Sequence, residues 1–261
     1  MPPELAKRLE AYQQKVVANA ENVVFKIFPQ KVSVVHFVRH LLAYSRIHSD
    51  LQDMIDASSD PSSPFHMSHA SISTDATVYP DPSAERCQDS KKRKLADGEG
   101  RTNGVRTDNA RYTEAVHTNH HIEKVYAIMK KECEELARLC DDVSIWIQLA
   151  MPKIEDGDNF GVAIQEEALA ELNRCQQSAY NLRDSPRQHH QNRAKLCSKL
   201  IKYPNLEDYS LALKEHDEKM LYTARSNLFD LRNLYAVITN LFQKNIAKIR
   251  APKGNNAVSL Y

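Results

Sequence analysis

Glycine is scarce in this sequence, with six residues among 261. Glycine weakens helices more than any other residue except proline, so the long stretches without it are free to form helices. The glycines lie in a polar stretch, in the segment PKIEDGDNFG (152–161) and near the C-terminus, as Gly98, Gly100, Gly104, Gly157, Gly161 and Gly254. The sequence therefore predicts long helices that are separated at these places.

Long apolar runs, an excess of one charge and paired cysteines are also lacking. No segment has the roughly 18 uncharged apolar residues that cross a membrane, and the N-terminus, MPPELAKRLEAYQQ, is charged from its start. The 35 basic and 34 acidic residues leave a net charge of +1, so no overall field attracts nucleic acid or anionic lipid. The five cysteines form no CxxC pair, and their odd number fits poorly with a disulfide framework. We expect a soluble protein of the cytosol or nucleus, with neither a nucleic-acid nor a membrane partner.

Apolar residues recur at alternating steps of three and four in four segments, which is the pattern of a helix with one buried face. One such helix should start at a cap formed by Asp108 or Thr113 and end before Pro152, after about 40 residues. Trp146 lies beside its apolar stripe, where packing in the core or at a subunit interface is expected. The stripe comprises Ile122, Val125, Met129, Cys133, Leu136, Cys140, Val143, Ile147 and Ala150.

The other three periodic segments are similar in length. One spans 160–203, and Pro186 should kink or break it. Another spans 206–249, and the N-terminal segment 1–55 should form a helix that Pro29 bends. The sequence thus predicts one helix before the glycine-rich polar stretch and three after it.

Residues 56–108 are rich in Ser, Asp, Pro and Gly and have few large apolar side chains. This composition predicts a flexible linker, and at roughly 50 residues it is too long for an ordinary connection within a bundle. The remaining segment, 109–261, should hold the other three helices. We therefore expect the linker to be an external loop.

These segments together predict an all-α protein, a four-helix bundle of long antiparallel helices. In an up-down-up-down order, the second helix runs toward 152–161, the third runs away from it and the fourth returns. The C-terminal tail, 252–261, should therefore lie at the same end of the bundle as 152–161. The linker should lie at the opposite end.

Motifs for catalysis are absent from the sequence. It has no Gly-rich phosphate loop, nucleophile elbow or HExxH, and its Glu-x-x-His pair, Glu114 and His117, lacks the second pair that a di-iron bundle needs. The adjacent pairs His120–His121 and His189–His190 point in two directions on a helix, as surface histidines do. We expect no catalytic residue, no metal site and no cofactor, and a metal enzyme is a distant alternative.

One dense basic run lies in the predicted linker, where it is accessible to an import receptor. It consists of Lys91, Lys92, Arg93 and Lys94. The functional interpretation is nuclear import, with the nucleus as the main location and the cytoplasm as a second one. The alternative interpretation is a cluster that only makes the chain more soluble.

Several segments closely resemble signatures of the 11S proteasome activators, the REG family. The similarity is strong over about 115–261 and weaker in the N-terminal helix. The matching segments are WIQLAMPKIEDGDNFGVAIQEE (146–167), IKYPNLEDY (201–209), HDEKMLY (216–222), LRNLYAVI (231–238) and KNIAKIRAPKG (244–254).

This resemblance implies a homoheptameric ring of four-helix protomers that caps the α-ring of the 20S proteasome and opens its gate without ATP. C-terminal residues of the family dock between proteasome α-subunits, and several weak tails bind together through their high effective concentration. The docking residues here would be Ser259, Leu260 and Tyr261. The turn between the second and third helices is the family's activation loop, here Lys153, Ile154, Glu155, Asp156, Gly157, Asp158, Asn159, Phe160 and Gly161.

Within the family the sequence is similar to the gamma class, whose members are nuclear homoheptamers. RAKL (193–196) contains Lys195, which the resemblance associates with selective stimulation of the trypsin-like proteasome site. Three residues depart from the family pattern. Asp158 stands where relatives have Asn and adds a negative charge, Lys153 replaces an Arg and loses its bidentate geometry, and Pro186 has no expected counterpart.

An alternative without proteasome activity accounts for the same loop. Gly157 would end one helix in a left-handed conformation, and Asp158 or Asn159 would cap the next helix. In that case the protein is a helical-bundle scaffold or adaptor, the loop is only a turn and the tail is only a chain end.

Overall fold

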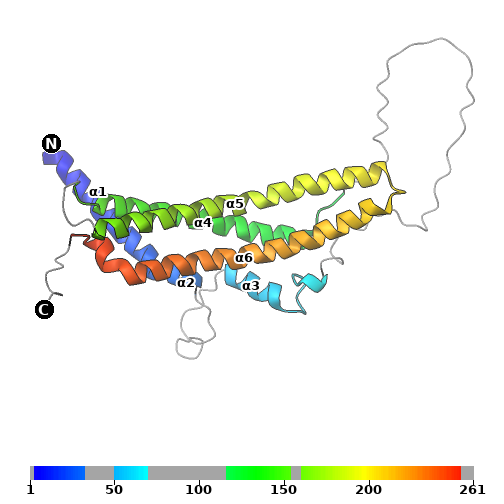
Figure 1. Cartoon of the computed structure of the whole chain (residues 1–261), viewed down its shortest axis with the longest axis horizontal. Helices are drawn as coiled ribbons and strands as arrows, with labels where there is room; N and C mark the ends of the chain where they lie inside the picture. Colours follow the sequence, from blue (N-terminus) through cyan, green and yellow to red (C-terminus); the bar gives the residue numbers. More distant parts are fainter. Residues whose placement is uncertain (1–2, 33–49, 70–115, 154–159, 254–261) are drawn as a thin grey trace, which may run out of the picture.

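The computed structural model describes residues 3–32, 50–69, 116–153 and 160–253. Every regular element within these ranges is a helix, and three long helices run side by side along the molecule (Figure 1). They are α4, His120–Ala150; α5, Phe160–Lys202; and α6, Glu207–Arg250. The all-α fold and the helical bundle predicted from the sequence are confirmed.

Helix α4 begins later than predicted, because Asn119 is its cap rather than Asp108 or Thr113. The side-chain Oδ1 of Asn119 accepts hydrogen bonds from the backbone N–H groups of His121 (3.0 Å) and Ile122 (3.2 Å). The first N–H groups of a helix have no partner inside it, so a side chain that meets two of them fixes the start of the helix. The apolar periodicity could not reveal this start.

Pro186 does not break α5, so of the two predicted effects, a kink or a break, the break is wrong. The helix continues for 43 residues through this proline, which is buried. Proline removes one backbone hydrogen bond, but most helical stability in proteins comes from packing of an apolar face. Helices α4 and α6 pack along α5, and this packing keeps the chain helical across the missing bond.

Residues 3–32 of the N-terminal segment are helical throughout, and a widened turn lies just before Pro29, where the sequence predicted a bend. Helix α1, Pro3–Asn22, is followed by a π-helical turn, η1, Val23–Ile27, and by α2, Phe28–Val32. The first residue of α2 donates its backbone N–H to the carbonyl of the first residue of η1, five residues back. Because Pro29 follows at once and cannot donate an N–H group, the widened turn lies where the regular hydrogen-bond ladder is interrupted.

The packed part of the chain extends beyond the predicted start of the linker at residue 56. Helix α3, Asp50–Ser59, and the short 3-10 helix η2, Met67–His69, lie on the bundle, and the ring of Phe65 meets that of His121 edge-on at 5.4 Å. Because of the serines at the end of α3, the sequence predicted a linker here. In the structure Ser58 is part of the helix, and its hydroxyl donates a hydrogen bond to the backbone carbonyl of Ile55. Residues 70–108 lie outside the described ranges.

One apolar core joins the facing sides of α4, α5, α6 and the N-terminal elements. The stripe predicted on α4 is buried, apart from Ala150, which is partly exposed, and Trp146 packs in the core as expected. All the cysteines that the structure describes are buried, and none of them forms a disulfide. The largest fully buried side chains include Phe28, Leu51, Tyr126, Met129, Leu136, Ile147, Leu172, Tyr235 and Phe242.

Buried charge attaches the N-terminal segment to the bundle. Lys31 of α2 donates to the carboxylates of Glu132 (2.8 Å) and Glu135 (2.7 Å) of α4. Burial alone would lower the pKa of Lys31, but the hydrogen bonds to both glutamates raise the pKa overall. Burial raises the pKa of Glu132, although Lys31 opposes this effect. Removal of Lys31 would leave a buried carboxylate unpaired, which makes this pair a strong constraint on where α2 lies.

The histidines of α5 are not all at the surface, contrary to expectation. His189 is 1% exposed, and its Nδ1 lies 3.1 Å from Nε2 of His216 on α6, with the two rings stacked. Tyr126 of α4 and the neighbouring His190 also face His189. Burial is the main cause, and together with the nearby His216, His190 and Arg193 it lowers the pKa of His189 to about 3. Both imidazoles of the stacked pair are therefore neutral at pH 7, and one donates its N–H to the other.

This buried histidine pair predicts acid lability. An unfolded histidine titrates near 6.5, so below that pH the unfolded state takes up a proton that folded His189 does not, and stability falls as the pH drops from 6.5 toward 3. Between pH 7 and pH 5 the free energy of unfolding should fall by about 2 kcal/mol through this group. Urea unfolding across this range should show a smaller pH dependence for His189→Asn. The exposed control His120→Asn should keep the wild-type slope, and equal slopes in all three proteins would contradict this account.

Candidate functional site

One end of the bundle brings together segments that are distant in the sequence. Here α4 ends, α5 begins and α6 ends, at the left of Figure 1. We define the loop–tail end by residues 151–153, 160–161 and 251–253. These residues flank 154–159 and precede 254–261, so the positions where the predicted loop and tail leave the bundle are described.

The start of α5 and the end of α6 meet in direct backbone contact. Gly161 is buried, and a methyl group at its Cα would overlap the Cα, carbonyl carbon and carbonyl oxygen of Pro252. Only glycine allows two backbones to come this close without displacement of one of them. The role of Gly161 is therefore to let the base of the tail lie against the base of the loop.

A buried side chain bridges the same two helices one turn further along. The Nε2 of Gln165 on α5 donates a 2.8 Å hydrogen bond to the backbone carbonyl of Ile249 on α6. This carbonyl belongs to the last turn of α6, where carbonyl groups lack partners within the helix. Gln165 therefore closes the end of α6 and fixes it to α5.

Aromatic and basic side chains surround this junction. Phe160 is exposed at the start of α5, and Lys248 Nζ of α6 lies 6.0 Å from its ring centroid. Arg250 forms a 2.8 Å ion pair with Glu21 of α1 and lies over the ring of Phe25 in η1. Basic residues in the last turn of α6 suit the negative end of its dipole, and these contacts bring the N-terminal segment to the same end.

Some of the predicted site residues lie within the described ranges and others lie outside them. Lys153, Phe160 and Gly161 lie at the loop–tail end, as the bundle topology predicted. The rest of the loop (Ile154, Glu155, Asp156, Gly157, Asp158 and Asn159), the docking residues (Ser259, Leu260 and Tyr261) and the basic run (Lys91, Lys92, Arg93 and Lys94) lie outside the described residues.

Lys195 is exposed on α5, near the far end of the bundle. It is 34 residues beyond Gly161 on a continuous helix, a separation of about 50 Å. It therefore cannot contribute to the loop–tail end of its own chain, and its association with specificity stays a prediction.

The Glu-x-x-His pair is not on the first turns of α4. His117 precedes the helix, and Glu114 lies outside the described residues. Among the residues that the structure places, there is no group of three or more His, Cys, Asp or Glu side chains arranged to hold a metal. Over the same ranges, no helix combines the length and apolar character of a membrane span.

Gln165 is the junction residue that sequence reasoning missed. It is a polar residue at a core position of α5, because it lies at helical spacing from the buried Gly161, Ala168 and Leu172 and shares their face of the helix. A buried glutamine on an apolar face needs a hydrogen-bond partner, and that requirement was the available signal. Its partner, a backbone carbonyl 84 residues away, could not be read from the sequence.

Comparison with known proteins gives a family match over the part of the chain that builds this end. Residues 115–259 match the family model described as "Proteasome activator PA28, C-terminal". The chain belongs to the PA28 family of proteasome activators. The expected 11S resemblance is thereby confirmed, and the matched range includes both sides of the Gly161–Pro252 junction.

Relatives of the whole chain carry the same family name. Proteasome activator complex subunit 3 of Gallus gallus is 31% identical over 264 residues, which covers 99% of this chain and 97% of that protein. The crystal structure of the 11S subunit of the Plasmodium falciparum proteasome, PA28, superposes with a TM-score of 0.68 at 24% identity and covers 97% of this chain and 96% of that one. A chain from a crystal structure of an archaeal 20S proteasome in complex with a mutated activator gives a TM-score of 0.58 at 14% identity, over 97% of this chain and 99% of that one. The bundle is thus the PA28 fold, and the gamma-class likeness agrees with the subunit 3 relatives.

The Gly161–Pro252 contact predicts an unusual response to Gly161→Ala. Alanine normally stabilises a helix relative to glycine, but here its methyl group must displace the base of the tail, so the free energy of unfolding should fall by about 1–3 kcal/mol. Hydrogen exchange in the last turn of α6 should become faster. The exposed control Ala163→Ser should change stability by no more than about 0.5 kcal/mol. If Gly161→Ala stabilises the protein, the close approach is wrong.

Proposed function

We propose that the chain is a non-catalytic, ATP-independent activator that binds the end of the 20S proteasome, opens its gate and stimulates peptide degradation. The observation that carries this proposal is the Gly161–Pro252 junction, which brings the residue after 154–160 against the residue that begins 252–261. Membership of the PA28 family supports the same conclusion. A protein with this arrangement can bind a ring through its tail and present its loop to the same ring.

The two segments have different tasks in this mechanism. Residues 254–261 span at most about 28 Å when extended, which is enough to reach from the bundle into a neighbouring surface. Ser259, Leu260 and Tyr261 of this segment bind between proteasome α-subunits. The shorter segment 154–159 cannot reach far from its anchored ends, so it acts on the gating segments directly above it.

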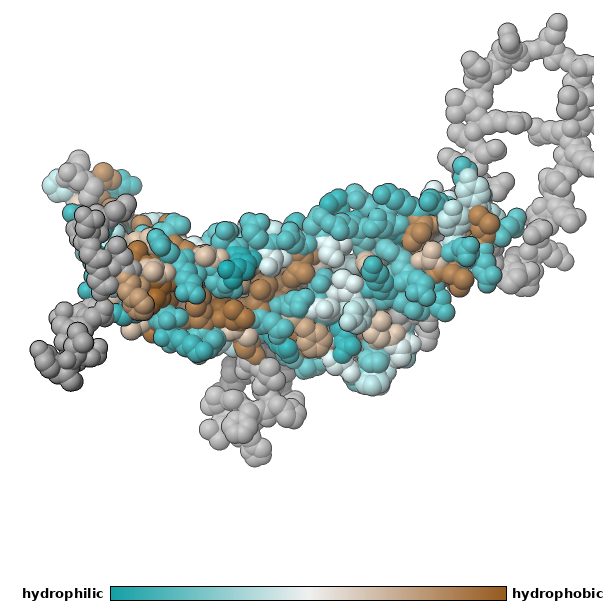
Figure 2. Space-filling view, in the orientation of Figure 1, coloured by the Kyte–Doolittle hydropathy of each residue, from teal (hydrophilic) through white to brown (hydrophobic). Residues whose placement is uncertain are grey.

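The proposed assembly is a homoheptamer, which lets several weak tails bind at once. Helix α1 supports self-association, because Leu5, Leu9 and Tyr12 are exposed at the spacing of one helix face. Figure 2 shows further apolar side chains gathered over the half of the bundle nearest to the loop–tail end. Exposed apolar surface of this kind is typical of a subunit interface.

The remaining parts of the proposal concern location and specificity. The basic run Lys91–Lys94 binds an import receptor and directs the protein to the nucleus, with the cytoplasm as a second location.

Lys195 of each subunit favours the trypsin-like proteasome activity. Its exposure on α5 leaves it accessible to a neighbouring subunit or to a passing peptide.

Self-association predicts that native mass spectrometry will detect a species of about seven times the 29.8 kDa chain mass. Leu9→Glu should lower the population of this species, because it places a charge in the exposed apolar stripe of α1. Arg8→Glu is the matched control, since it changes the adjacent exposed residue and should leave the ring intact. A monomer in the wild type, or an equal effect of the two changes, would refute the interface.

Gate opening is tested with purified latent 20S proteasome and short fluorogenic peptides. The wild-type chain should stimulate hydrolysis, and deletion of Tyr261 should abolish both co-sedimentation and stimulation. Asp158→Asn should alter stimulation while binding is retained, since the loop acts after docking. The control Asp208→Asn changes an exposed acid at the other end of α6 and should match the wild type. Co-sedimentation without stimulation would favour an adaptor, and the absence of binding would reject the proposal.

A further inference from the structure

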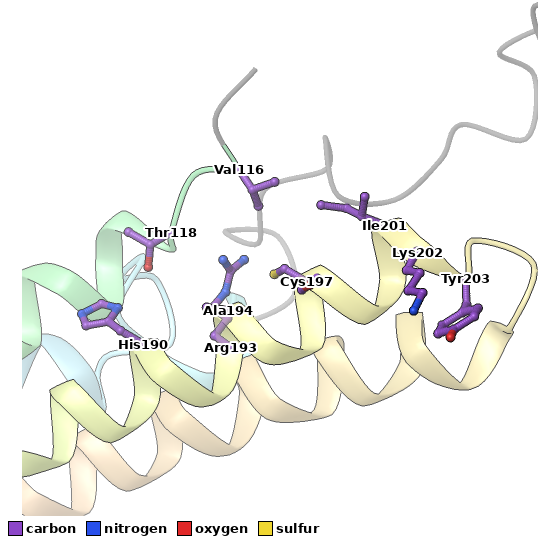
Figure 3. A pocket seen from close by; sticks show the side chains of 10 residues that line it. Val116, Thr118, His190, Arg193, Ala194, Cys197, Ile201, Lys202 and Tyr203 are labelled. Atoms are coloured by element: carbon purple, nitrogen blue, oxygen red, sulfur yellow. The ribbon is translucent and has the colours of Figure 1, made fainter. Parts of the chain in front are cut away.

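A cavity lies at the end of the bundle opposite the loop–tail end. Its volume is about 790 Å³, and it lies between residues 116–118, which lead into α4, and the last turns of α5 (Figure 3). This volume is within the range of small-molecule sites. Nothing in the proposed proteasome mechanism uses it.

The floor of this cavity is a buried guanidinium group with one unused nitrogen. Arg193 is 5% exposed; its Nε donates to Asp217 Oδ1 at 3.0 Å, and its Nη1 donates to the backbone carbonyl of His117 at 3.1 Å. Its Nη2 is buried and has no hydrogen-bond partner, and the same is true of the hydroxyl of Thr118. Figure 3 shows both groups directed into the space between 116–118 and α5. Buried donors without partners are costly, so a ligand that accepts from them is stabilised.

Charge favours an anion at this position. The cavity lining includes three basic residues, Arg193, His190 and Lys202, and none of the described residues that line it is acidic. Asp217 pairs with Arg193 and offsets its charge. Lys202, whose Nζ lies 5.2 Å from the ring centroid of Tyr203, has no acidic neighbour among the described lining residues. The N-terminus of α4 nearby adds a partial positive charge. The charges around the cavity therefore favour a ligand with one negative charge over a ligand with two.

Apart from Ser198 and Tyr203, the rest of the cavity lining is apolar. Val116 lies on one side, and Ala194, Cys197 and Ile201 of α5 lie on the other (Figure 3). Such walls reject a fully hydrated ion such as inorganic phosphate, because its charge and hydration shell would have no partners there. They accept a ligand that carries a short apolar body behind its charged group.

We propose that this cavity binds a small organic monocarboxylate. The carboxylate accepts hydrogen bonds from Arg193 Nη2 and Thr118 Oγ1, and the apolar body lies against Val116, Cys197 and Ile201, with Lys202 in the lining further along α5. Charge-assisted bonds of this kind are the strong ones in proteins. The ligand would join the residues that lead into α4 to the end of α5, and its binding does not depend on proteasome activation.

The test is isothermal titration of the full chain with sodium hexanoate, acetate, hexanol and phosphate at constant ionic strength. Hexanoate should bind saturably and at least tenfold more tightly than acetate, because its longer chain is buried, and hexanol and phosphate should not bind measurably. Equal binding of hexanol, or tighter binding of phosphate than of hexanoate, would overturn the proposal. So would the absence of saturable binding of hexanoate.

Variants that leave the Arg193–Asp217 pair intact test whether hexanoate binds in this cavity. Ala194→Leu fills the cavity from an exposed position of α5 and should abolish hexanoate binding, while Thr118→Val and Lys202→Met should each weaken it severalfold. Lys214→Met removes an exposed lysine of α6 outside the cavity and should bind like the wild type. Thermal unfolding should confirm that each variant is folded. Retained binding in Ala194→Leu, or equal loss in Lys214→Met, would reject this site.

Discussion

The close approach of Gly161 to Pro252 is the constraint on which the functional end of this protein depends. Two long helices of 43 and 44 residues must end and begin in register for their backbones to touch, so an error in length or packing anywhere along them would separate the two bases. The hydrogen bond from Gln165 to Ile249 fixes this register one turn away. The last residue of the loop and the first residue of the tail are thereby held against each other.

The rest of the bundle maintains this register. The apolar core along α4, α5 and α6 holds these antiparallel helices side by side, and the Lys31–Glu132 pair fixes the N-terminal segment against α4. Arg250 then links the last turn of α6 to Glu21 of α1, so the base of the tail is supported from two sides. The polar groups at the other end, around Arg193 and His189, form a separate centre whose chemistry is independent of the tail.

Sequence periodicity was sufficient for the three long helices and for their order, because the three- and four-residue spacing of buried side chains is a local property. It placed the buried stripe of α4 correctly and deduced that 152–161 and 252–261 leave the bundle at one end. It failed where distant groups decide the outcome. Asn119 replaced the expected caps, packing carried α5 through Pro186, and His189 became buried because α4 and α6 both face it. Gln165 and the backbone contact at Gly161 depend on partners more than 80 residues away, which no local pattern contains.

Electron cryomicroscopy of the chain mixed with 20S proteasome tests most directly whether the Gly161–Pro252 junction organises one docking end. The structure predicts that the bundles stand on the α-ring by this end, with density for 154–159 and for 254–261 in contact with the same ring and the α5–α6 turn pointing away. A complex in which the bundles dock by the opposite end, or in which only one of the two segments reaches the proteasome, would contradict it.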